Sequence, residues 1–250
     1  MNVALAVAAL PPALALGSFL NVVAARLPEG RSLVSPPSSC GSCGTEIAWR
    51  DNVPVLSFLL LRGRCRHCGT RIGARYLAVE VGTALLVAAC FLVFGATADA
   101  VVASVFVSAL VVLSAIDVER RILPDKIVLP TAAAVLAAQI VLHPDRALEF
   151  VLAALGAALF LFLALLAYPR GMGMGDVKLC LLLGAMLGKA VVVALMVGMV
   201  AALLPAFVLL ARHGAAARKM GIPFGPFLAL GAVVALFVGD RLLGAYLGAF

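Results

Sequence analysis

The sequence predicts an all-α polytopic membrane protein with a small polar insert between its first and second membrane helices. Three observations support this fold class. Hydrophobic residues make up 64% of the 250 positions and charged residues only 12%, whereas soluble globular domains carry about 25% charged residues. Long apolar runs recur between short charged segments, and a single long polar segment interrupts them. Soluble, disordered, coiled-coil and collagen-like architectures are therefore excluded.

The apolar runs indicate about eight membrane helices, because one bilayer crossing needs about 20 apolar helical residues. The expected spans are 2–25, 76–94, 100–116, 127–142, 147–168, 177–187, 190–211 and 224–249. The first span is followed by Arg26 and has no basic residue before it, so we interpret it as an uncleaved helix and not as a signal peptide. The sixth span is short, and we expect that helix to be shortened or partly re-entrant.

The distribution of basic residues predicts how the chain is oriented in the membrane. Cytoplasmic loops carry an excess of Lys and Arg. With the N-terminus outside, 16 of the 19 basic residues fall on the cytoplasmic side. They are Arg26, Arg31, Arg50, Arg62, Arg64, Arg66, Arg71, Arg75, Arg120, Arg121, Lys126, Arg170, Lys178, Arg212, Arg218 and Lys219. The net charge of +7 is then a sign of topology, and we expect the lipid bilayer, and no nucleic acid, as a partner.

This orientation divides the chain into a first helix (1–25), a cytoplasmic insert (26–75) and a helical membrane domain (76–250). Two C-x-x-C pairs in the insert predict a structural zinc site. They are Cys40 with Cys43, and Cys65 with Cys68. A glycine follows each pair and permits the tight turn that directs two thiolates at one tetrahedral ion. Disulfides and redox-active thiols are the alternatives, of which a reducing cytoplasm disfavours disulfides. His67 is not expected to be a ligand, since four sulfurs saturate the metal.

The insert has too little apolar mass to fold by itself, so metal binding would supply the missing free energy. Trp49 and the apolar run 53–61 are expected to form a small core or to lie at the bilayer interface.

Two aspartates are the candidate catalytic residues. Asp117 is expected at the end of the third helix and Asp176 at the start of the sixth, both at the cytoplasmic face. An ionisable side chain in the bilayer is costly, and such residues are functional candidates. Paired carboxylates in a poorly solvated site can share one proton, so that one acts as base and the other as acid, as in aspartic peptidases. The glycines at 171, 173 and 175 would let an extended peptide approach Asp176 closely.

Structural roles for the acidic residues stay open at this point. Asp117 could pair with Arg120 or Arg121, and Asp176 could cap its own helix. Asp125, which follows Pro124, is an equally good cap and a second candidate for the catalytic group of the first motif.

Two other classes of function are also compatible with these residues. A proton- or cation-coupled transporter could use Asp117, Asp176 and Glu80 along an ion path. Glu80 could otherwise pair with an arginine of the insert or bind a substrate amine. A noncatalytic zinc-dependent membrane scaffold is the third reading.

Six motifs in order along nearly the whole chain resemble those of the type IV prepilin peptidases, which are bifunctional leader peptidases and N-methyltransferases. The motifs are Gly17-Ser18-Phe19-Leu20-Asn21-Val22-Val23, the two cysteine pairs, Asn52-Val53-Pro54-Val55-Leu56-Ser57 with Leu61-Arg62-Gly63-Arg64-Cys65, Asp117 with Leu123-Pro124-Asp125, Gly173-Met174-Gly175-Asp176, and Ile222-Pro223-Phe224-Gly225-Pro226.

The resemblance implies that prepilin and pseudopilin leaders are cleaved at the cytoplasmic face of the bacterial inner membrane, after a glycine and before the hydrophobic segment. It also implies methyl transfer from S-adenosylmethionine to the new N-terminal amine. In this reading Asp117 and Asp176 are catalytic and the four paired cysteines bind zinc. The sequence contains no G-x-G-x-x-G for a methyl donor, so the methyltransferase half and its cofactor rest on resemblance alone. The donor site, the individual pilin substrates and the oligomeric state stay open.

Overall fold

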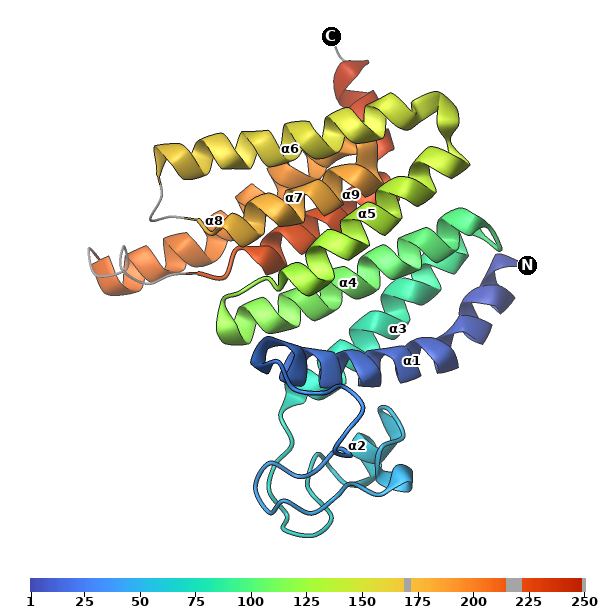
Figure 1. Cartoon of the computed structure of the whole chain (residues 1–250), viewed down its shortest axis with the longest axis vertical. Coiled ribbons are helices and arrows are strands. Elements are labelled where there is room, and N and C mark those ends of the chain that lie inside the picture. Colours follow the sequence, from blue (N-terminus) through green and yellow to red (C-terminus); the bar gives the residue numbers. More distant parts are fainter. Residues whose placement is uncertain (169–171, 215–221, 249–250) are drawn as a thin grey trace. The chain divides into compact units, whose positions relative to one another are not determined.

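A computed structural model describes residues 1–168, 172–214 and 222–248 (Figure 1). These residues are mostly helical, and seven helical segments among them are long and apolar enough to cross a membrane. No β-strand occurs in the described ranges, where only two isolated bridges lie within the insert. The predicted all-α membrane fold is therefore confirmed.

The first of two compact units covers Met1–Ile116. Its helix α1 (Asn2–Arg26) packs along α3 (Ala74–Phe94). The two backbones meet at Gly17, where a Cβ atom would lie 2.7 Å from Cα of Glu80. Asn21 then joins the helices by donating from Nδ2 to the Tyr76 carbonyl at 3.0 Å. Small residues at such contacts allow membrane helices to approach closely.

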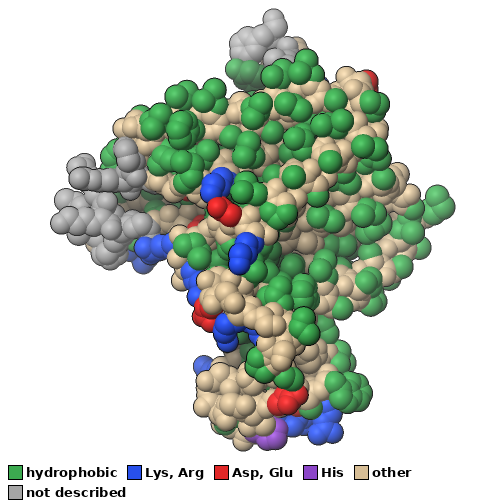
Figure 2. Space-filling view, viewed as in Figure 1, with side chains coloured by type: hydrophobic (Ala, Val, Ile, Leu, Met, Phe, Trp, Pro, Cys, Tyr) green, Lys and Arg blue, Asp and Glu red, His purple; other side chains and the backbone are tan. Residues whose placement is uncertain are grey.

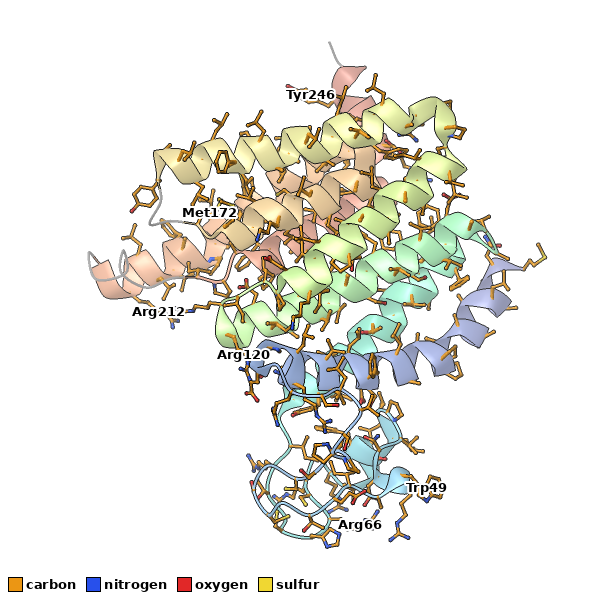
Figure 3. The ribbon with its side chains drawn as sticks, viewed as in Figure 1. Trp49, Arg66, Arg120, Met172, Arg212 and Tyr246 are labelled. Atoms are coloured by element: carbon orange, nitrogen blue, oxygen red, sulfur yellow. The ribbon has the colours of Figure 1, made fainter. Side chains whose placement is uncertain are left out.

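The insert lies between α1 and α3 and contains a short helix, α2 (Leu56–Leu60), and the 3-10 turn η2 (Trp49–Asp51). Figure 3 shows Trp49 pointing away from the insert, and 85% of this residue is exposed. The expectation that Trp49 contributes to a small core is therefore wrong, while its place at a bilayer interface stays a prediction.

The second unit begins at Asp117, in the last turn of α4 (Ala98–Arg120), and its described residues form five further α-helices. They are α5 (Asp125–Leu142), α6 (Ala147–Ala167), α7 (Met174–Leu187), α8 (Val191–His213) and α9 (Gly225–Leu247). Helix α7 is the centre of this unit, because it packs against α5, α6, α8 and α9. Its side chains are buried along nearly its whole length.

The helices agree with the expected spans except at the ends that carry the aspartates. Helix α4 continues to Arg120, beyond the expected end at residue 116, and α7 begins at Met174. The predicted short sixth helix is confirmed, since α7 has only 14 residues. By length and hydropathy α7 and α8 form one continuous segment of 39 residues, which is why seven candidate spans correspond to the eight expected helices.

The outer faces of the long helices are apolar. Figure 2 shows hydrophobic side chains over much of the visible face of these helices. In the second unit, Leu152, Leu204 and Phe207 are each more than half exposed. Exposed apolar surface of this extent is typical of helices that face lipid.

Candidate active site and metal centre

The two cysteine pairs fold into the same backbone turn. In each pair the N–H of the first cysteine donates to the carbonyl of a threonine five residues later, Thr45 or Thr70, at 2.9 Å. The following glycine, Gly44 or Gly69, donates back to the first cysteine's carbonyl at 2.9 and 3.0 Å. Both glycines have a φ of +70°, the left-handed region that favours glycine. The glycine after each pair is thus required by the turn, as predicted.

The turns bring the four paired sulfur atoms together. All four Sγ atoms lie within 4.8 Å of one another, and those of Cys40 and Cys68 are 3.8 Å apart. Thiolates bound tetrahedrally to zinc at about 2.3 Å would be about 3.8 Å apart. The four cysteines are free thiols and form no disulfide. The group consists of cysteines and does not include His67, so the donor set fits a metal ion such as zinc.

Threonines support the sulfur ligands. The hydroxyl oxygens of Thr45 and Thr70 lie 3.3 Å from Sγ of Cys43 and Cys68, respectively. The hydrogen bond with the Thr70 side chain, together with one from its backbone, lowers the pKa of Cys68 to about 6. The lowered pKa of Cys68 favours the thiolate, the form that binds metals. These threonines are not among the predicted site residues, although they recur in the repeat C-x-x-C-G-T-x-I at 40–47 and 65–72.

An ion pair connects the turn that contains Cys65 and Cys68 to η2. Arg66 donates from Nε and Nη2 to the two carboxylate oxygens of Asp51, at 2.8 and 2.6 Å. This hydrogen-bonded pair holds the pKa of Asp51 below its usual value. Both residues lie in the insert, where Figure 3 labels Arg66. The contact connects the metal centre to the rest of the insert.

Glu80 attaches the insert to α3. Its Oε2 accepts a hydrogen bond from the backbone N–H of Val55 at 2.8 Å, and only 9% of Glu80 is exposed. Val55 has a φ of +62°, an uncommon conformation for a β-branched residue. The partner that the insert supplies to Glu80 is a backbone amide, where the sequence suggested an arginine.

Asp117 lies in the last turn of α4, three residues before the final residue Arg120. Its Oδ2 accepts a hydrogen bond from the N–H of Gly225 at 3.0 Å, and its side chain is buried. The helix continues past Asp117 to Arg120 and closes with Arg121 at a φ of +55°. The expected interaction with Arg121 is present as an electrostatic contact, but the hydrogen bond of the carboxylate is to Gly225.

Asp176 is the third residue of α7 and is also buried. Its Oδ2 accepts a hydrogen bond from the N–H of Gly173, the N-cap residue, at 3.2 Å. A carboxylate in the first turn of a helix is stabilised by the free N–H groups and by the helix dipole. The capping contact that the sequence left open is thus present. Gly171, also expected beside Asp176, lies outside the described residues, as do Arg170, Arg218 and Lys219.

The structure brings the two aspartates together in the second unit. Leu123 lies next to Gly175, at the start of α7, and next to Gly225, at the start of α9. A Cβ atom added to Gly175 would be 3.0 Å from Cβ of Leu123, and a Cβ atom added to Gly225 would be 3.4 Å from Cδ2 of Leu123. Asp117 and Asp176 are close enough to interact electrostatically. Two buried carboxylates in such proximity do not both ionise easily. One carboxyl group of such a pair can keep its proton while the other is ionised, as general acid-base chemistry requires.

Asp125 forms an ion pair that the sequence did not predict. Both of its carboxylate oxygens accept hydrogen bonds from Nζ of Lys178, at 2.8 and 2.7 Å. Asp125 is the first residue of α5, makes no side-chain capping bond, and about half of its side chain is exposed. The capping prediction is wrong because a lysine from a later helix takes the carboxylate. The ion pair links α5 to α7 close to Asp176.

Two models of known protein families match this chain. Residues 12–94 match the bacterial peptidase A24 N-terminal domain, and residues 104–210 match the type IV leader peptidase family. The chain belongs to the type IV leader peptidase family. Gly225 lies beyond both matched ranges of this leader peptidase, whereas the four paired cysteines, Asp117 and Asp176 lie within them.

Relatives of this leader peptidase carry the name prepilin leader peptidase/N-methyltransferase. The protein from Burkholderia pseudomallei (strain 1026b) is 35% identical over an alignment 261 residues long. The alignment covers 90% of this chain and 83% of the relative. The Bacillus subtilis (strain 168) protein is 34% identical over 94% of both chains. The Pseudomonas aeruginosa protein is 36% identical over 94% of this chain and 90% of the relative. No solved structure matches.

Proposed function

We propose that this protein is a membrane aspartic endopeptidase that removes the leaders of type IV prepilins and pseudopilins and then N-methylates the new N-terminal residue. One observation carries the peptidase assignment: Asp117 and Asp176 are buried together, and each carboxylate is held by a backbone N–H at the start of a helix. The names of the relatives supply the substrate class and the second activity. Neither the family nor the site supports a transporter.

The catalytic step uses one ionised and one protonated aspartate. The carboxylate removes a proton from water, whose oxygen attacks the scissile carbonyl carbon, while the carboxylic acid protonates the carbonyl oxygen. When the tetrahedral intermediate collapses, the C–N bond breaks and the amine leaves with a proton, so no covalent enzyme intermediate forms. Within the described residues Oδ2 of each aspartate accepts a backbone N–H, which leaves Oδ1 for water and substrate.

The segment before α7 suits an extended peptide. Gly173 has an extended backbone (φ −97°, ψ 155°) and is exposed, three residues before Asp176. An extended substrate could approach the backbone closely at Gly173, which has no side chain. This supports cleavage beside Asp176.

Methyl transfer would follow cleavage, because its acceptor is the amine that cleavage releases. S-adenosylmethionine would supply the methyl group. The names of the relatives and the sequence resemblance support the N-methyltransferase activity.

We further propose that the four cysteines bind one structural zinc ion, with Cys40, Cys43, Cys65 and Cys68 as ligands. The sulfur geometry supports this assignment. Metal analysis of the freshly purified protein should return about one zinc per chain, as a single tetrahedral site requires. A protein that folds and is active without metal would contradict this role.

The direct test of function uses the purified full chain in detergent. It is incubated with a peptide that contains a prepilin leader and the start of its hydrophobic segment, together with methyl-labelled S-adenosylmethionine. We expect cleavage after the leader glycine, seen by mass, and label on the shortened product only. Cleavage without label would reject the methyltransferase half, and absence of cleavage would reject the peptidase.

A further inference from the structure

Gly225 supplies the hydrogen bond that fixes Asp117. It is the first residue of α9, and its N–H lies 3.0 Å from Oδ2 of Asp117 in a buried contact that spans 108 sequence positions. The first N–H groups of a helix have no partner within that helix, and the helix dipole favours a carboxylate there. The start of α9 therefore stabilises the carboxylate of a residue on another helix.

The space beside Gly225 has no room for a side chain. A Cβ at this position would lie 2.8 Å from Oδ2 and 3.3 Å from Cγ of Asp117. Gly225 is not among the described residues with a positive φ, so its backbone conformation does not itself require glycine. The reason for glycine is the carboxylate, which lies where a side chain would be.

The following residue makes the start of α9 rigid. Pro226 lies in the first turn of the helix, where proline is favoured because its φ is already fixed near the helical value. Asp176 has an equivalent support, since it accepts the N–H of Gly173 at the start of α7. Each of the two carboxylates is thus fixed by the first residues of a helix.

We propose that Gly225 is a positioning residue for Asp117 in the peptidase reaction. Its N–H holds Oδ2, and the absence of a side chain leaves the carboxylate its place beside Asp176. This inference rests on the proposed peptidase function. It predicts that a methyl group at position 225 displaces Asp117 and slows the chemical step, while substrate binding is retained.

The test compares Gly225→Ala with Gly244→Ala in the full chain. Gly244 lies on the same helix and has open space where its Cβ would be. We expect Gly225→Ala to lower kcat for leader cleavage by roughly 10- to 100-fold, the cost of misplacing a catalytic group by about 1 Å, with KM changed by less than about twofold. Gly244→Ala should keep both constants near wild type. A near-normal kcat in Gly225→Ala, or a loss confined to KM, would overturn the proposal.

A double-mutant cycle separates displacement of the carboxylate from crowding of Leu123, the other neighbour of the added methyl group. If Asp117 is the group that matters, Gly225→Ala lowers kcat by the same factor in a Leu123→Ala background as in the wild type. Recovery of kcat when Leu123 is shortened would assign the loss to packing and overturn the positioning role. Failure of the wild type to cleave would instead reject the proposed function, on which this role depends.

Discussion

Buried polar side chains in this protein obtain their hydrogen bonds from the backbone. Asp117, Asp176 and Glu80 each accept a backbone N–H, and Asn21 and Gln139 each donate to a backbone carbonyl. A buried polar group without a partner costs several kcal/mol in an apolar environment. These five side chains are thus located where a backbone N–H or carbonyl group can pair with them.

Thr70 is predicted to set the acid stability of the metal centre. Thr70→Val removes the hydroxyl that contributes most to lowering the pKa of Cys68 to about 6, so this pKa should rise. The lowered pKa of Cys68 stabilises the folded form, in which Cys68 is a thiolate. This contribution to the free energy of unfolding is complete above about pH 9 and disappears as the pH falls through about 6. In Thr70→Val protons should displace zinc at a higher pH. A chromogenic chelator measures the midpoint of zinc release.

The matched control is Ser42→Ala, an exposed position in the first cysteine turn, which should leave the midpoint where it is in the wild type. An unchanged midpoint in Thr70→Val would contradict the role of the hydroxyl.

The sequence identifies candidate site residues whose side chains have the required chemistry. It does not identify residues that act through their backbone. Asp117 and Asp176 stand out because charge is rare here, and the cysteines because of their spacing. Gly225 acts through an N–H that every non-proline residue has, on a partner 108 positions away. The partner of Asp125 is also remote, since Lys178 follows it by 53 positions. Contacts of this kind depend on tertiary packing, which composition and periodicity do not encode.

At the scale of helices, hydropathy locates the spans well and their polar ends poorly. The apolar run before Asp117 ends at residue 116, but the hydrogen-bonded helix continues to Arg120, because charged residues are compatible with a helical backbone. The helix ends shortly before Pro124, as expected from the restriction that proline places on the preceding residue. Helix α7, with 14 residues, is about 21 Å long and shorter than a hydrocarbon core of about 30 Å.

Helix α7 should depend on Gly184 for its contact with α6. A Cβ at Gly184 would lie 2.5 Å from Cα of Ala154, so Gly184→Ala must push two backbones apart. Overpacking of this kind costs about 1–3 kcal/mol, and we expect a lower midpoint of thermal unfolding in detergent. Gly156→Ala on α6 adds its methyl group to open space and should not lower the midpoint. Equal midpoints for the two variants would contradict the close packing of α6 and α7.

At the scale of the whole molecule, the two compact units carry different parts of the chemistry. Met1–Ile116 contains the cysteine insert, and Asp117–Phe250 contains both aspartates. The two family ranges, 12–94 and 104–210, meet before this boundary, so the second range begins within the first unit. Long apolar helices occur in both units, as expected for a multi-pass membrane protein.

The orientation predicted from the basic residues can be tested by cysteine labelling. Ser32→Cys lies in the insert and Asp145→Cys in the turn Pro144–Arg146 between α5 and α6. In right-side-out membrane vesicles an impermeant maleimide should label position 145, and position 32 only after permeabilisation. The opposite labelling pattern would contradict the positive-inside assignment.

The central claim is that Asp117 and Asp176 form the catalytic pair. Leader cleavage by purified Asp117→Asn and Asp176→Asn tests it most directly, with Asp125→Asn as the matched control because Asp125 is held by Lys178. We predict that each catalytic variant remains folded and loses cleavage by about 10²- to 10⁴-fold, the contribution of general acid-base catalysis, while Asp125→Asn loses less than about tenfold. Near-normal cleavage by Asp117→Asn or Asp176→Asn would contradict the account.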